Sequence, residues 1–428
     1  MGKAAAILGV HILHAGGAAR VGTLSRSAAG ETAFVVEEAY LRDPGRPILS
    51  LSWFEPSSEL GTQERLAYRG DKIGLLGSLP PWFAGLLPEG ALHELVLQEM
   101  GPGDHDQFDL LTRLGADLPG AVLVTPETQT PVSAGPLKLE QVAGFNAPRP
   151  EGIVKFSLAG IQLKFAGRMD GDRLMVPARA GDARCILKVP TNRFPGLPEA
   201  EFAGMELARS IGVHTADCQL LPVGKVSGIP PEFLAAGSHA LVVDRFDRAA
   251  DDRRIHMEDM AQIVGALGER KYTMGTGETV LNMIRRFSSD WRGDVLEGIR
   301  RIVADILIGN GDNHLKNWSF LFPGPDEIRL SPAYDIVPTV LYIPDDQMAL
   351  RFVNASTFNA ITLRRFRRVA KFLGLDEDWI ENKVVQQVET AIEAWPELVR
   401  SLLDEQRASR LLERLASLTL VREVTGGN

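Results

Sequence analysis

Short apolar runs separated by turn residues dominate the first part of the chain. We predict strands at Ala4–Leu13, Val21–Leu24, Thr32–Val36 and Ile48–Trp53, because apolar and β-branched residues gather there between segments that carry Gly and Pro. The first run also resembles a short signal peptide, but it contains His11 and leads directly into further strand patterns, which favours a strand. This region is therefore expected to be a small β-rich unit.

A helical pattern follows the predicted strands. Pro88–Met100 carries apolar residues at helical spacing, and Asp109–Leu114 adds a short helix before a strand at Gly120–Thr125. The next stretch is polar and rich in Pro, Gly and Thr, which is typical of a domain boundary. We therefore predict an N-terminal domain at 1–126 and a linker at 127–150.

The predicted N-terminal domain shows no catalytic set of residues. His14, His93 and His105 are isolated from one another, and an isolated histidine is more often a surface or packing residue than a ligand. We interpret this domain as a regulatory or partner-binding module.

A glycine-bearing turn opens the next region, predicted at 151–248. Residues 151–165 suggest two strands joined by a tight turn at Ala159 and Gly160. Backbone N–H groups of such a turn can approach the phosphates of a nucleotide closely. An ordinary hairpin is the alternative, and the turn alone does not decide between the two.

A lysine-bearing strand, an amphipathic helix and a further strand follow the turn. Arg184–Pro190 is a short apolar strand whose Lys188 is either an edge charge or a lysine that pairs nucleotide phosphates. The helix at Glu199–Ile211 offers Glu201 or Glu206 to orient that lysine, and Glu201 is favoured because it lies near the helix start. The strand at Ala240–Leu241–Val242–Val243 then turns polar at 244–248, where a chain can cross between two lobes.

The remainder, 249–428, is mainly helical in its periodicity. Helices are predicted near Leu363–Leu373, Asp378–Ala394 and Pro396–Leu418, with leucines on one face of the last helix, as expected for core packing.

The candidate chemistry lies in a loop between two apolar runs of this last region. Asp312 and Asn317 stand five residues apart, and Asp335 follows beyond a second apolar stretch. An Asp that accepts a hydroxyl proton, an Asn that binds a metal ion and a later Asp that shares this ion are the residues that phosphoryl transfer of the kinase type requires. A turn that only ends a helix and begins a strand is the structural alternative.

Composition narrows the function classes. The 428 residues allow about two or three domains, and 45% hydrophobic with 24% charged residues is typical of a soluble globular protein. A formal charge of −9 disfavours global affinity for nucleic acid, although a local basic patch is compatible with it. Cys185 and Cys218 are the two cysteines, so a disulfide framework is not expected and a reducing cytoplasm fits. No apolar run approaches the length of a membrane-spanning helix.

Taken together in this order, the motifs resemble those of the HipA family of protein kinases, the toxins of bacterial HipBA toxin–antitoxin modules. The resemblance spans essentially the whole chain. Its motifs are Tyr40–Gly45, Leu49–Ser52, Phe83–Gly90, Leu114–Ala121, Ser157–Lys164, Val243–Arg248, Met257–Gln262, Gly311–Asn317 and Tyr334–Ile336.

The resemblance implies an α+β protein: a small β-rich N-terminal domain, then a bilobal protein-kinase-like fold with a small lobe at 151–248 and an all-helical C-terminal lobe at 249–428. It also implies a serine/threonine kinase that uses ATP and Mg²⁺, with Asp312 as the catalytic base and Asn317 and Asp335 as metal ligands. The implied nucleotide-binding residues are Ser157, Ala159, Gly160, Ile161, Gln162, Leu163, Lys164, Lys188, Asp244, Arg245, Phe246, His314, Leu315, Lys316, Asn317, Tyr334 and Asp335.

Regulation and partners are also implied by the resemblance. Ser157 resembles the serine whose autophosphorylation silences members of the family, and a phosphate there would repel those of the nucleotide. The implied partners are a helix-turn-helix antitoxin of the HipB type, operator DNA reached through the antitoxin complex, and a protein substrate such as an aminoacyl-tRNA synthetase. Leu163 stands where the best-known members carry Glu, so gating of the phosphate loop can differ here.

A basic cluster gives a candidate DNA contact. The cluster is Arg364, Arg365, Arg367, Arg368 and Lys371, and its alternative is a solvated helix face whose long side chains cover apolar surface. Two other functions remain open at this point: a small-molecule kinase, because the loop pattern also occurs there, and an inactive subunit of an antitoxin–DNA complex.

Overall fold

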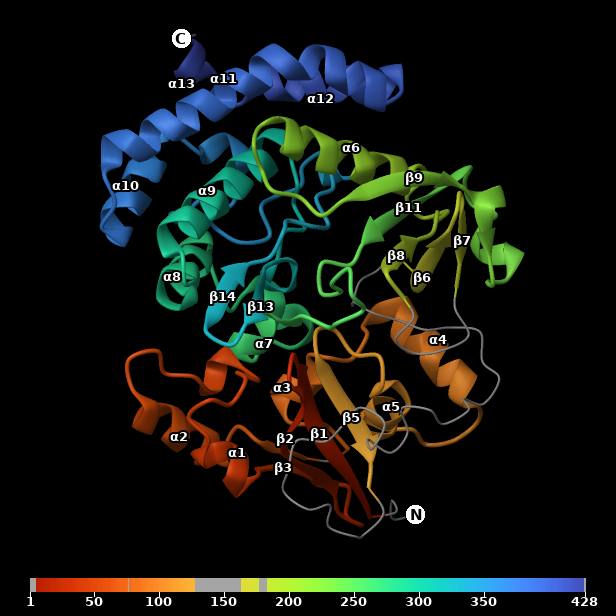
Figure 1. Cartoon of the computed structure of the whole chain (residues 1–428). Coiled ribbons are helices and arrows are strands. Elements are labelled where there is room, and N and C mark those ends of the chain that lie inside the picture. Colours follow the sequence, from red (N-terminus) through yellow and green to blue (C-terminus); the bar gives the residue numbers. More distant parts are fainter. Residues whose placement is uncertain (1–4, 76, 128–162, 177–182, 427–428) are drawn as a thin grey trace.

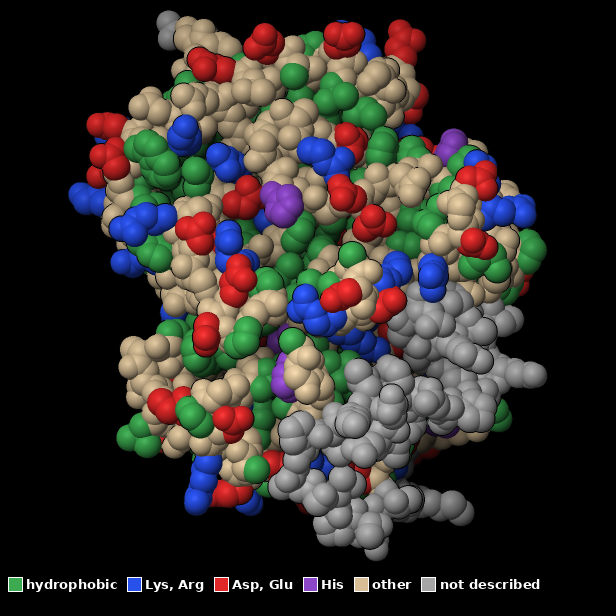
Figure 2. Space-filling model, in the orientation of Figure 1, with side chains coloured by type: hydrophobic (Ala, Val, Ile, Leu, Met, Phe, Trp, Pro, Cys, Tyr) green, Lys and Arg blue, Asp and Glu red, His purple; other side chains and the backbone are tan. Residues whose placement is uncertain are grey.

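The computed structural model describes residues 5–75, 77–127, 163–176 and 183–426. In Figure 1 the N-terminal domain lies at the bottom, a small lobe with strands β6 to β11 lies to the right, and the helical lobe extends to the top left. Basic and acidic side chains are interspersed over the upper part of the face drawn in Figure 2. No described helix combines the length and the apolar character needed to cross a membrane.

The N-terminal domain is built on a five-stranded antiparallel sheet in the order β4-β3-β2-β1-β5. Buried Leu8, Val10 and Ile12 alternate along β1 and face the core of this domain. Its strands are β1 (Ala6–His14), β2 (Gly17–Arg26), β3 (Thr32–Val36), β4 (Ile73–Gly74) and β5 (Val122–Pro126). Its helices are α1 (Glu38–Arg42), α2 (Glu59–Ala67), α3 (Pro81–Ala84), α4 (Gly90–Met100) and α5 (Gln107–Leu114).

The strand predicted at Ile48–Trp53 is wrong. Leu51–Trp53 forms a short 3-10 helix, which begins where the Ser50 hydroxyl accepts a hydrogen bond from the Ser52 N–H. This turn directs Leu51 into the core of the C-terminal lobe and Trp53 into the core of the N-terminal domain, whereas a strand would place these two side chains on the same face. A run of apolar residues was therefore mistaken for a strand.

The small lobe contains a six-stranded sheet in the order β10-β7-β6-β8-β11-β9, with helix α6 (Leu197–Ser210) packed on it. The predicted Lys188 strand, the helix after it and the strand before the crossing are confirmed as β8, α6 and β11. Of the two strands predicted at 151–165, the first lies outside the described residues. The strands are β6 (Lys164–Asp170), β7 (Arg173–Met175), β8 (Cys185–Lys188), β9 (Cys218–Pro222), β10 (Val226–Ser227) and β11 (His239–Asp244).

The C-terminal lobe is largely helical, but a three-stranded sheet departs from the all-helical prediction. Strand β13 (Ser319–Gly324) pairs with β12 (His256–Asp259) on one side and β14 (Glu327–Leu330) on the other. The apolar run after Asn317 therefore forms a central strand, which follows the loop Gly311–Asn317, the predicted catalytic loop. The helices are α7 (Met260–Val264), α8 (Gly277–Phe287), α9 (Trp291–Ile308), α10 (Leu363–Leu373), α11 (Glu377–Leu402), α12 (Glu405–Ser417) and α13 (Thr419–Thr425).

The boundary predicted at Pro396 is also wrong. Pro396 lies inside the long helix α11, between the buried residues Trp395 and Val399. Helix α12 begins later, where the Asp404 carboxylate accepts the N–H of Arg407 and caps it. Core packing on both sides of the proline outweighs the hydrogen bond that the proline removes.

The N-terminal domain is not separated from the rest of the chain. One hydrophobic core joins its residues Val10 and Val124 to Phe165, Leu187 and Val242 of the small lobe. A buried carboxylate makes a second connection. Glu258 of β12 accepts hydrogen bonds from three groups of the N-terminal domain: the Ser50 hydroxyl at 2.6 Å, the Leu51 N–H at 2.8 Å and the Trp82 indole N–H at 2.8 Å. The domain is thus packed under both lobes.

Candidate active site

Two adjoining pockets lie where the N-terminal domain, the small lobe and the C-terminal lobe meet. Both are lined by Pro119, Met257, Tyr334 and Asp335, so they form one continuous cleft. The small-lobe side adds Ile186, Lys188, Val243, Asp244, Arg245, Phe246 and Asp247. The catalytic-loop side adds Gly85, Leu86, Leu87, Asp259, Gln262, Lys316, Asn317 and Ser319.

Three buried charged side chains and the half-buried Asp335 meet at the centre of this cleft. Lys188 on β8 contacts the carboxylates of Glu201 on α6 and of Asp335. The Nζ atom of Lys164 on β6 lies 2.9 Å from Oδ2 of Asp335. Of the two glutamates considered, Glu201 therefore orients Lys188, while Glu206 contacts Arg209 on its own helix.

The electrostatics of this group keep Lys188 and Asp335 charged. Burial opposes ionisation of Asp335, but the two lysine ammonium groups hold the pKa of its carboxyl well below the usual range. Burial also disfavours the charged lysine, yet Asp335 and Glu201 raise the pKa of Lys188 above its ordinary value. The cleft thus contains an anion and two lysine side chains, a set of charges suited to binding a cation and phosphate oxygens.

The segment that carries Asp335 is held by both lobes. The Ala333 N–H donates to the His214 carbonyl at 2.8 Å, and the Ala216 N–H donates to the Ala333 carbonyl at 2.8 Å. Asp335 has a positive φ of 56°, a conformation that Asp tolerates better than most residues. This conformation turns its carboxylate toward the lysines.

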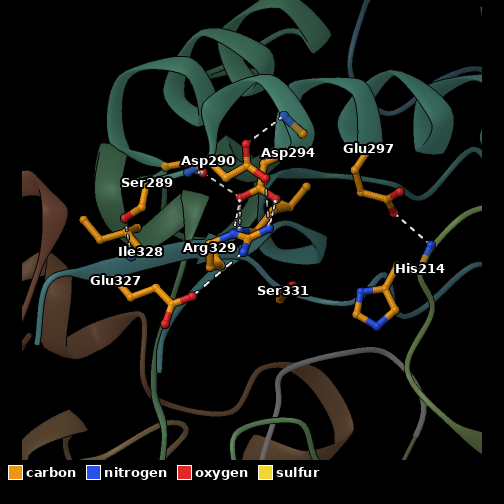
Figure 3. A network of polar contacts seen from close by, with 12 residues as sticks. His214, Ser289, Asp290, Asp294, Glu297, Glu327, Ile328, Arg329 and Ser331 are labelled. Carbon is orange, nitrogen blue, oxygen red and sulfur yellow. Dashed lines mark hydrogen bonds and ion pairs between the residues drawn. The ribbon is translucent and has the colours of Figure 1, made fainter. Parts of the chain in front are cut away.

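A polar network on α9 anchors the strand that leads to this segment (Figure 3). The Asp294 carboxylate accepts the Leu330 N–H at 2.8 Å and hydrogen bonds from the Arg329 guanidinium. Glu297 of the same helix accepts the His214 N–H at 3.0 Å, so the helix also holds the chain that pairs with Ala333. Helix α9 therefore fixes both sides of the segment before Asp335.

The catalytic loop begins where α9 ends at Gly309, whose φ of 80° lies in the left-handed region that favours glycine. Buried Asp305, in the last turn of α9, accepts a hydrogen bond from Asn310 Nδ2 at 2.8 Å and another from Asn313. Burial raises the pKa of Asp305 to about 7 despite these bonds. The helix end therefore sets the path of the loop that carries Asp312.

Two neighbours hold Asp312 in place, and the resulting contacts still allow its carboxylate to accept a proton. The Tyr272 hydroxyl donates to Asp312 Oδ1 at 2.8 Å, and the Asn317 amide nitrogen donates to the Asp312 carbonyl at 2.8 Å. Burial raises the pKa of the Asp312 carboxyl, which makes it a better proton acceptor. Because the amide nitrogen of Asn317 is used in this way, its side-chain oxygen is the atom available to a cation.

The donor set fits a magnesium ion. Asn317 and Asp335 line the same pocket and offer oxygen ligands, which Mg²⁺ prefers. Mg²⁺ in kinase sites is typically bound by one or two protein oxygens together with phosphates and waters. When bound, the ion would neutralise charge on the transferred phosphate, and these two side chains are the residues that would hold it.

The other residues predicted in the catalytic loop divide into structural and cleft-lining groups. His314 is buried and packs on Tyr272 with ring centroids 5.0 Å apart, and burial lowers the pKa of its imidazole to about 3. Leu315 is part of the hydrophobic core. Tyr334 lines both pockets, and its hydroxyl donates to the Lys316 carbonyl at 2.8 Å. His314 and Leu315 therefore hold the loop through packing and do not line the cleft.

The predicted hinge lies in the cleft, but its three residues face different partners. Phe246 packs against Tyr334 with ring centroids 5.5 Å apart, and both side chains line the small-lobe part of the cleft. The Arg245 guanidinium instead donates to both oxygens of Asp247, at 2.9 and 2.8 Å. Asp244 is exposed at the end of β11 and lines the same part of the cleft; partial desolvation, together with the nearby Asp217, raises the pKa of its carboxyl.

The predicted phosphate loop is described at its end. Ser157, Ala159, Gly160, Ile161 and Gln162 lie outside the described residues. Leu163 is half-buried and leads into β6, and Lys164 points into the charge cluster at Asp335.

Several cleft residues were not found by the sequence reasoning. Gly85, Leu86, Leu87 and Glu89 come from the N-terminal domain, in which no catalytic set was recognised. Tyr272 and Asp259 lie far from the catalytic loop along the sequence, and burial raises the pKa of Asp259 to about 6. Two motifs of the family resemblance were the available signal: Phe83–Gly90 covers the first group, and Met257–Gln262 covers Asp259.

The basic cluster is divided between internal contacts and the surface. Arg365 donates to the carbonyl groups of Ala360 and Val353, and Arg367 forms ion pairs with acidic residues of α11. Arg364, Arg368 and Lys371 are exposed at helical spacing on one face of α10. These three residues are the part of the cluster that remains open to a partner.

The two-lobed arrangement, with a charged cleft and an Asp–Asn loop, defines a protein of the protein-kinase-like class. Comparisons with known proteins identify the family. Residues 15–125 match the HipA N-terminal domain model, and residues 156–395 match the model of the HipA-like C-terminal domain. The chain belongs to the HipA family of kinases.

Individual relatives agree with this assignment. The chain is 36% identical to the putative kinase Y4dM of Sinorhizobium fredii over 379 residues, which cover 88% of each protein. It is 25% identical over 369 residues to the serine/threonine-protein kinase toxin HipA of Shewanella oneidensis, covering 79% of this chain and 82% of that protein.

The fold also agrees with a solved structure. HipA in the complex of Shewanella oneidensis HipA, HipB and operator DNA superposes with a TM-score of 0.69 at 21% identity, covering 98% of this chain and 99% of that one. The expected α+β fold, with a β-rich N-terminal region, a kinase-like part and a helical C-terminal region, is confirmed.

Proposed function

We propose that this protein is an ATP- and Mg²⁺-dependent serine/threonine protein kinase that acts as the toxin of a bacterial toxin–antitoxin system. The observation that carries the proposal is the convergence of Lys188, Asn317 and Asp335 on one cleft, with Asp312 held on the adjoining loop. These are the residue types that phosphoryl transfer requires, and they come from three separate segments of the chain: β8, the loop from Asp312 to Asn317, and the segment that carries Asp335.

The chemistry assigns one role to each residue. Asp312 takes the proton of the acceptor hydroxyl while the hydroxyl oxygen bonds to the γ-phosphorus of ATP. The bond from this phosphorus to the β–γ bridging oxygen breaks, and ADP leaves with the electron pair. Lys188, oriented by Glu201, binds nucleotide phosphates, and Phe246 packs beside the adenine. Asn317 and Asp335 would hold the Mg²⁺ ion, which when bound would spread the negative charge of the transferred group.

The proposed substrate is a component of translation such as an aminoacyl-tRNA synthetase, whose phosphorylation would inhibit growth and promote persistence. The proposed controls are a HipB-like helix-turn-helix antitoxin and autophosphorylation at Ser157. Support comes from family membership and from a structural neighbour whose complex contains HipB and operator DNA. We place the protein in the cytoplasm, where its substrate and operator DNA are found.

Labelled ATP distinguishes this proposal from the alternatives. The protein is incubated with host lysate and ATP labelled at the γ-phosphate, with and without Asp312→Ala, and products are identified by mass spectrometry. Label on a protein serine or threonine, lost in the variant, is the expected result. Label only on small molecules would indicate a metabolite kinase, and no label at all would indicate an inactive subunit of an antitoxin complex.

The control by Ser157 is tested separately. Ser157→Ala is expected to retain kinase activity, whereas a homogeneous phospho-Ser157 form should not bind ATP, because about two negative charges would stand beside the nucleotide phosphates. Normal ATP affinity of the phosphorylated form would contradict this part of the proposal.

A further inference from the structure

A carboxylate of the N-terminal domain reaches the catalytic loop. Glu89 lies at the start of α4, which Figure 1 shows between the N-terminal sheet and the small lobe. Its Oε1 atom is 3.2 Å from Nζ of Lys316, and its Oε2 atom is 2.8 Å from Nζ of Lys271. Each oxygen of one carboxylate thus binds a different lysine of the C-terminal lobe.

The Glu89 side chain has no role in its own helix. Glu89 is the N-cap residue of α4, but its side chain makes no capping hydrogen bond. The two lysines keep the pKa of its carboxyl below the ordinary value, although burial acts in the opposite direction. The side chain is therefore an anion directed away from α4, and its substitution leaves the helix cap unchanged.

The geometry of Lys316 leaves one donor for the cleft. A lysine ammonium has three N–H donors. Two of them are directed at Glu89 and at the Gly85 carbonyl, which lies 3.3 Å from Nζ. Lys316 lines the pocket together with Asn317 and Asp335, so the third donor is left for an oxygen of the phosphate that is transferred. The N-terminal domain supplies both groups that fix this direction.

The second lysine, Lys271, connects Glu89 to Asp312, the proposed catalytic base. Lys271 precedes Tyr272 in the short 3-10 helix Gly268–Tyr272, and the Tyr272 hydroxyl donates to Asp312 at 2.8 Å. By holding Lys271, Glu89 also holds the turn that presents Tyr272 to Asp312. One carboxylate thus connects to both ends of the catalytic loop, at Asp312 and at Lys316.

We propose that Glu89 is a positioning residue of the kinase reaction, which acts through Lys316 and Lys271, so that the N-terminal domain completes the active site. This inference rests on the proposed kinase function. Its consequence is that a displacement of the N-terminal domain relative to the C-terminal lobe would release both lysines and lower the rate of transfer. The domain then has a direct part in catalysis in addition to any binding of partners.

The test compares full-length Glu89→Gln, which keeps the size of the side chain and removes its charge, with Glu89→Asp and with wild type. Two quantities are measured: the single-turnover rate of γ-phosphate transfer at saturating Mg·ATP, and the Kd of a fluorescent ATP analogue. Glu89→Gln is expected to lower the rate about 10- to 100-fold and change the Kd less than about twofold, because Lys316 faces the transferred phosphate rather than the adenine. Glu89→Asp, which keeps the charge, should recover part of the rate.

A double-mutant cycle separates positioning from a general effect on the fold. In the Lys316→Met background, Glu89→Gln should lower the rate by less than about threefold, because its main target is already absent. Glu94→Gln serves as the matched control, since Glu94 is exposed on the same helix, and it should behave as wild type.

Three results would overturn the inference while leaving the kinase function intact: a wild-type rate for Glu89→Gln, a rate above wild type, or full additivity with Lys316→Met. A rate above wild type would mean that Glu89 withholds Lys316 from the phosphate. If the wild-type protein itself neither binds ATP nor transfers phosphate, the proposed function fails first, so the two failures are distinguishable.

Discussion

Two buried groups of charged residues lie side by side along the cleft, and they are built differently. The lysine cluster consists of Lys164, Lys188, Glu201 and Asp335 and is held by contacts between side chains. The arginine cluster consists of Asp117, Arg245, Asp247, Arg248 and Arg254 and also binds the backbone of the N-terminal domain.

The arginine cluster has the features of a fixed connection. Asp247 accepts two hydrogen bonds from Arg245, one from Arg248 at 2.8 Å and one from the Gly120 N–H at 2.8 Å. Arg254 donates to the Ala116 carbonyl at 2.6 Å. Planar guanidinium groups that bind two oxygens at once have a single good geometry, so this cluster locks the hinge to the N-terminal domain.

The lysine cluster has the features of a site that exchanges partners. A lysine ammonium is a compact charge on a flexible stem and can move between acceptors with little change of backbone. Lys188 and Asp335 both line the cleft, so phosphates and a cation can replace the contacts between them. We therefore expect the arginine cluster to contribute mainly to the stability of the fold and the lysine cluster mainly to ligand binding.

The largest effect is expected at the base. Asp312→Asn should lower the rate of phosphate transfer by about three powers of ten, because the amide cannot take the proton of the acceptor. The Kd for ATP and the midpoint of thermal unfolding should stay near the wild-type values. A variant that transfers phosphate at the wild-type rate would remove Asp312 from its assigned role.

The second effect concerns stability rather than rate. Asp247→Ala should lower the free energy of unfolding by about 3–5 kcal/mol, because it leaves two buried guanidinium groups without their carboxylate. Urea-induced unfolding followed by tryptophan fluorescence measures this change. Asp251→Ala, at an exposed aspartate of the following turn, should change it by less than about 0.5 kcal/mol. Equal stability of the two variants would contradict the role of the arginine cluster.

The third effect is on nucleotide affinity and concerns the lysine cluster. Lys188→Met should raise the Kd for ATP about 10- to 100-fold, as expected for the loss of a hydrogen bond to a charged group. Lys225→Met, which removes an exposed lysine of the small lobe paired with Asp172, is the control and should leave the Kd unchanged. Equilibrium titration with a fluorescent ATP analogue gives both values. Unchanged affinity in Lys188→Met would mean that this lysine is structural.

The fourth effect is a dependence on pH at the junction with the N-terminal domain. Buried His256 donates from Nε2 to the Leu49 carbonyl at 2.8 Å, and burial lowers its pKa from 6.5 to about 4. The unfolded chain therefore binds a proton below pH 6.5 that the folded chain does not bind until about pH 4, so stability falls with acidification across this window.

The measurement for His256 compares wild type with His256→Gln in urea at pH 6.5 and pH 5.0. The wild type should lose about 1.5 kcal/mol more than the variant between these values, because the full effect of about 1.4 kcal/mol per pH unit applies only below the unfolded pKa of 6.5. Parallel losses in the two proteins would show that His256 does not titrate in this way. Glu258 acts in the opposite sense, because burial raises its pKa to about 7, and it is the same in both proteins.

The smallest effect concerns the exposed basic face of α10. In the complex with its antitoxin, Arg364→Ala together with Arg368→Ala should reduce the slope of log K against log salt for operator DNA by about 2, one for each phosphate contact. Arg367→Ala is a useful comparison because Arg367 pairs with Asp378 and Glu381 within the chain. If the double variant leaves the slope unchanged, this face does not contact DNA.

The sequence was most informative where a motif or a period is local. The strand with Lys188, the helix with Glu201 and the loop from Asp312 to Asn317 are each readable from a short window, and their order led to the family. The strand mistaken at Ile48–Trp53 shows the limit, since a 3-10 turn capped by Ser50 and a strand share the same apolar residues.

Contacts between distant segments were not readable in this way. Glu89 reaches Lys316 across more than half of the chain, and Tyr272 approaches Asp312 from a turn without a recognisable motif. The arginine cluster was hidden for the same reason, because Asp117 and Arg245 look like surface charges until the fold buries them together. Side chains that meet only through tertiary packing leave no periodic signal in the sequence.

A crystal structure of the full chain with Mg²⁺ and a non-hydrolysable ATP analogue tests the central claim most directly. We expect one Mg²⁺ bound by the Asn317 side-chain oxygen and the Asp335 carboxylate, adenine beside Phe246, and a phosphate oxygen bound by Lys188. A nucleotide bound elsewhere, or a cation that contacts neither Asn317 nor Asp335, would contradict it.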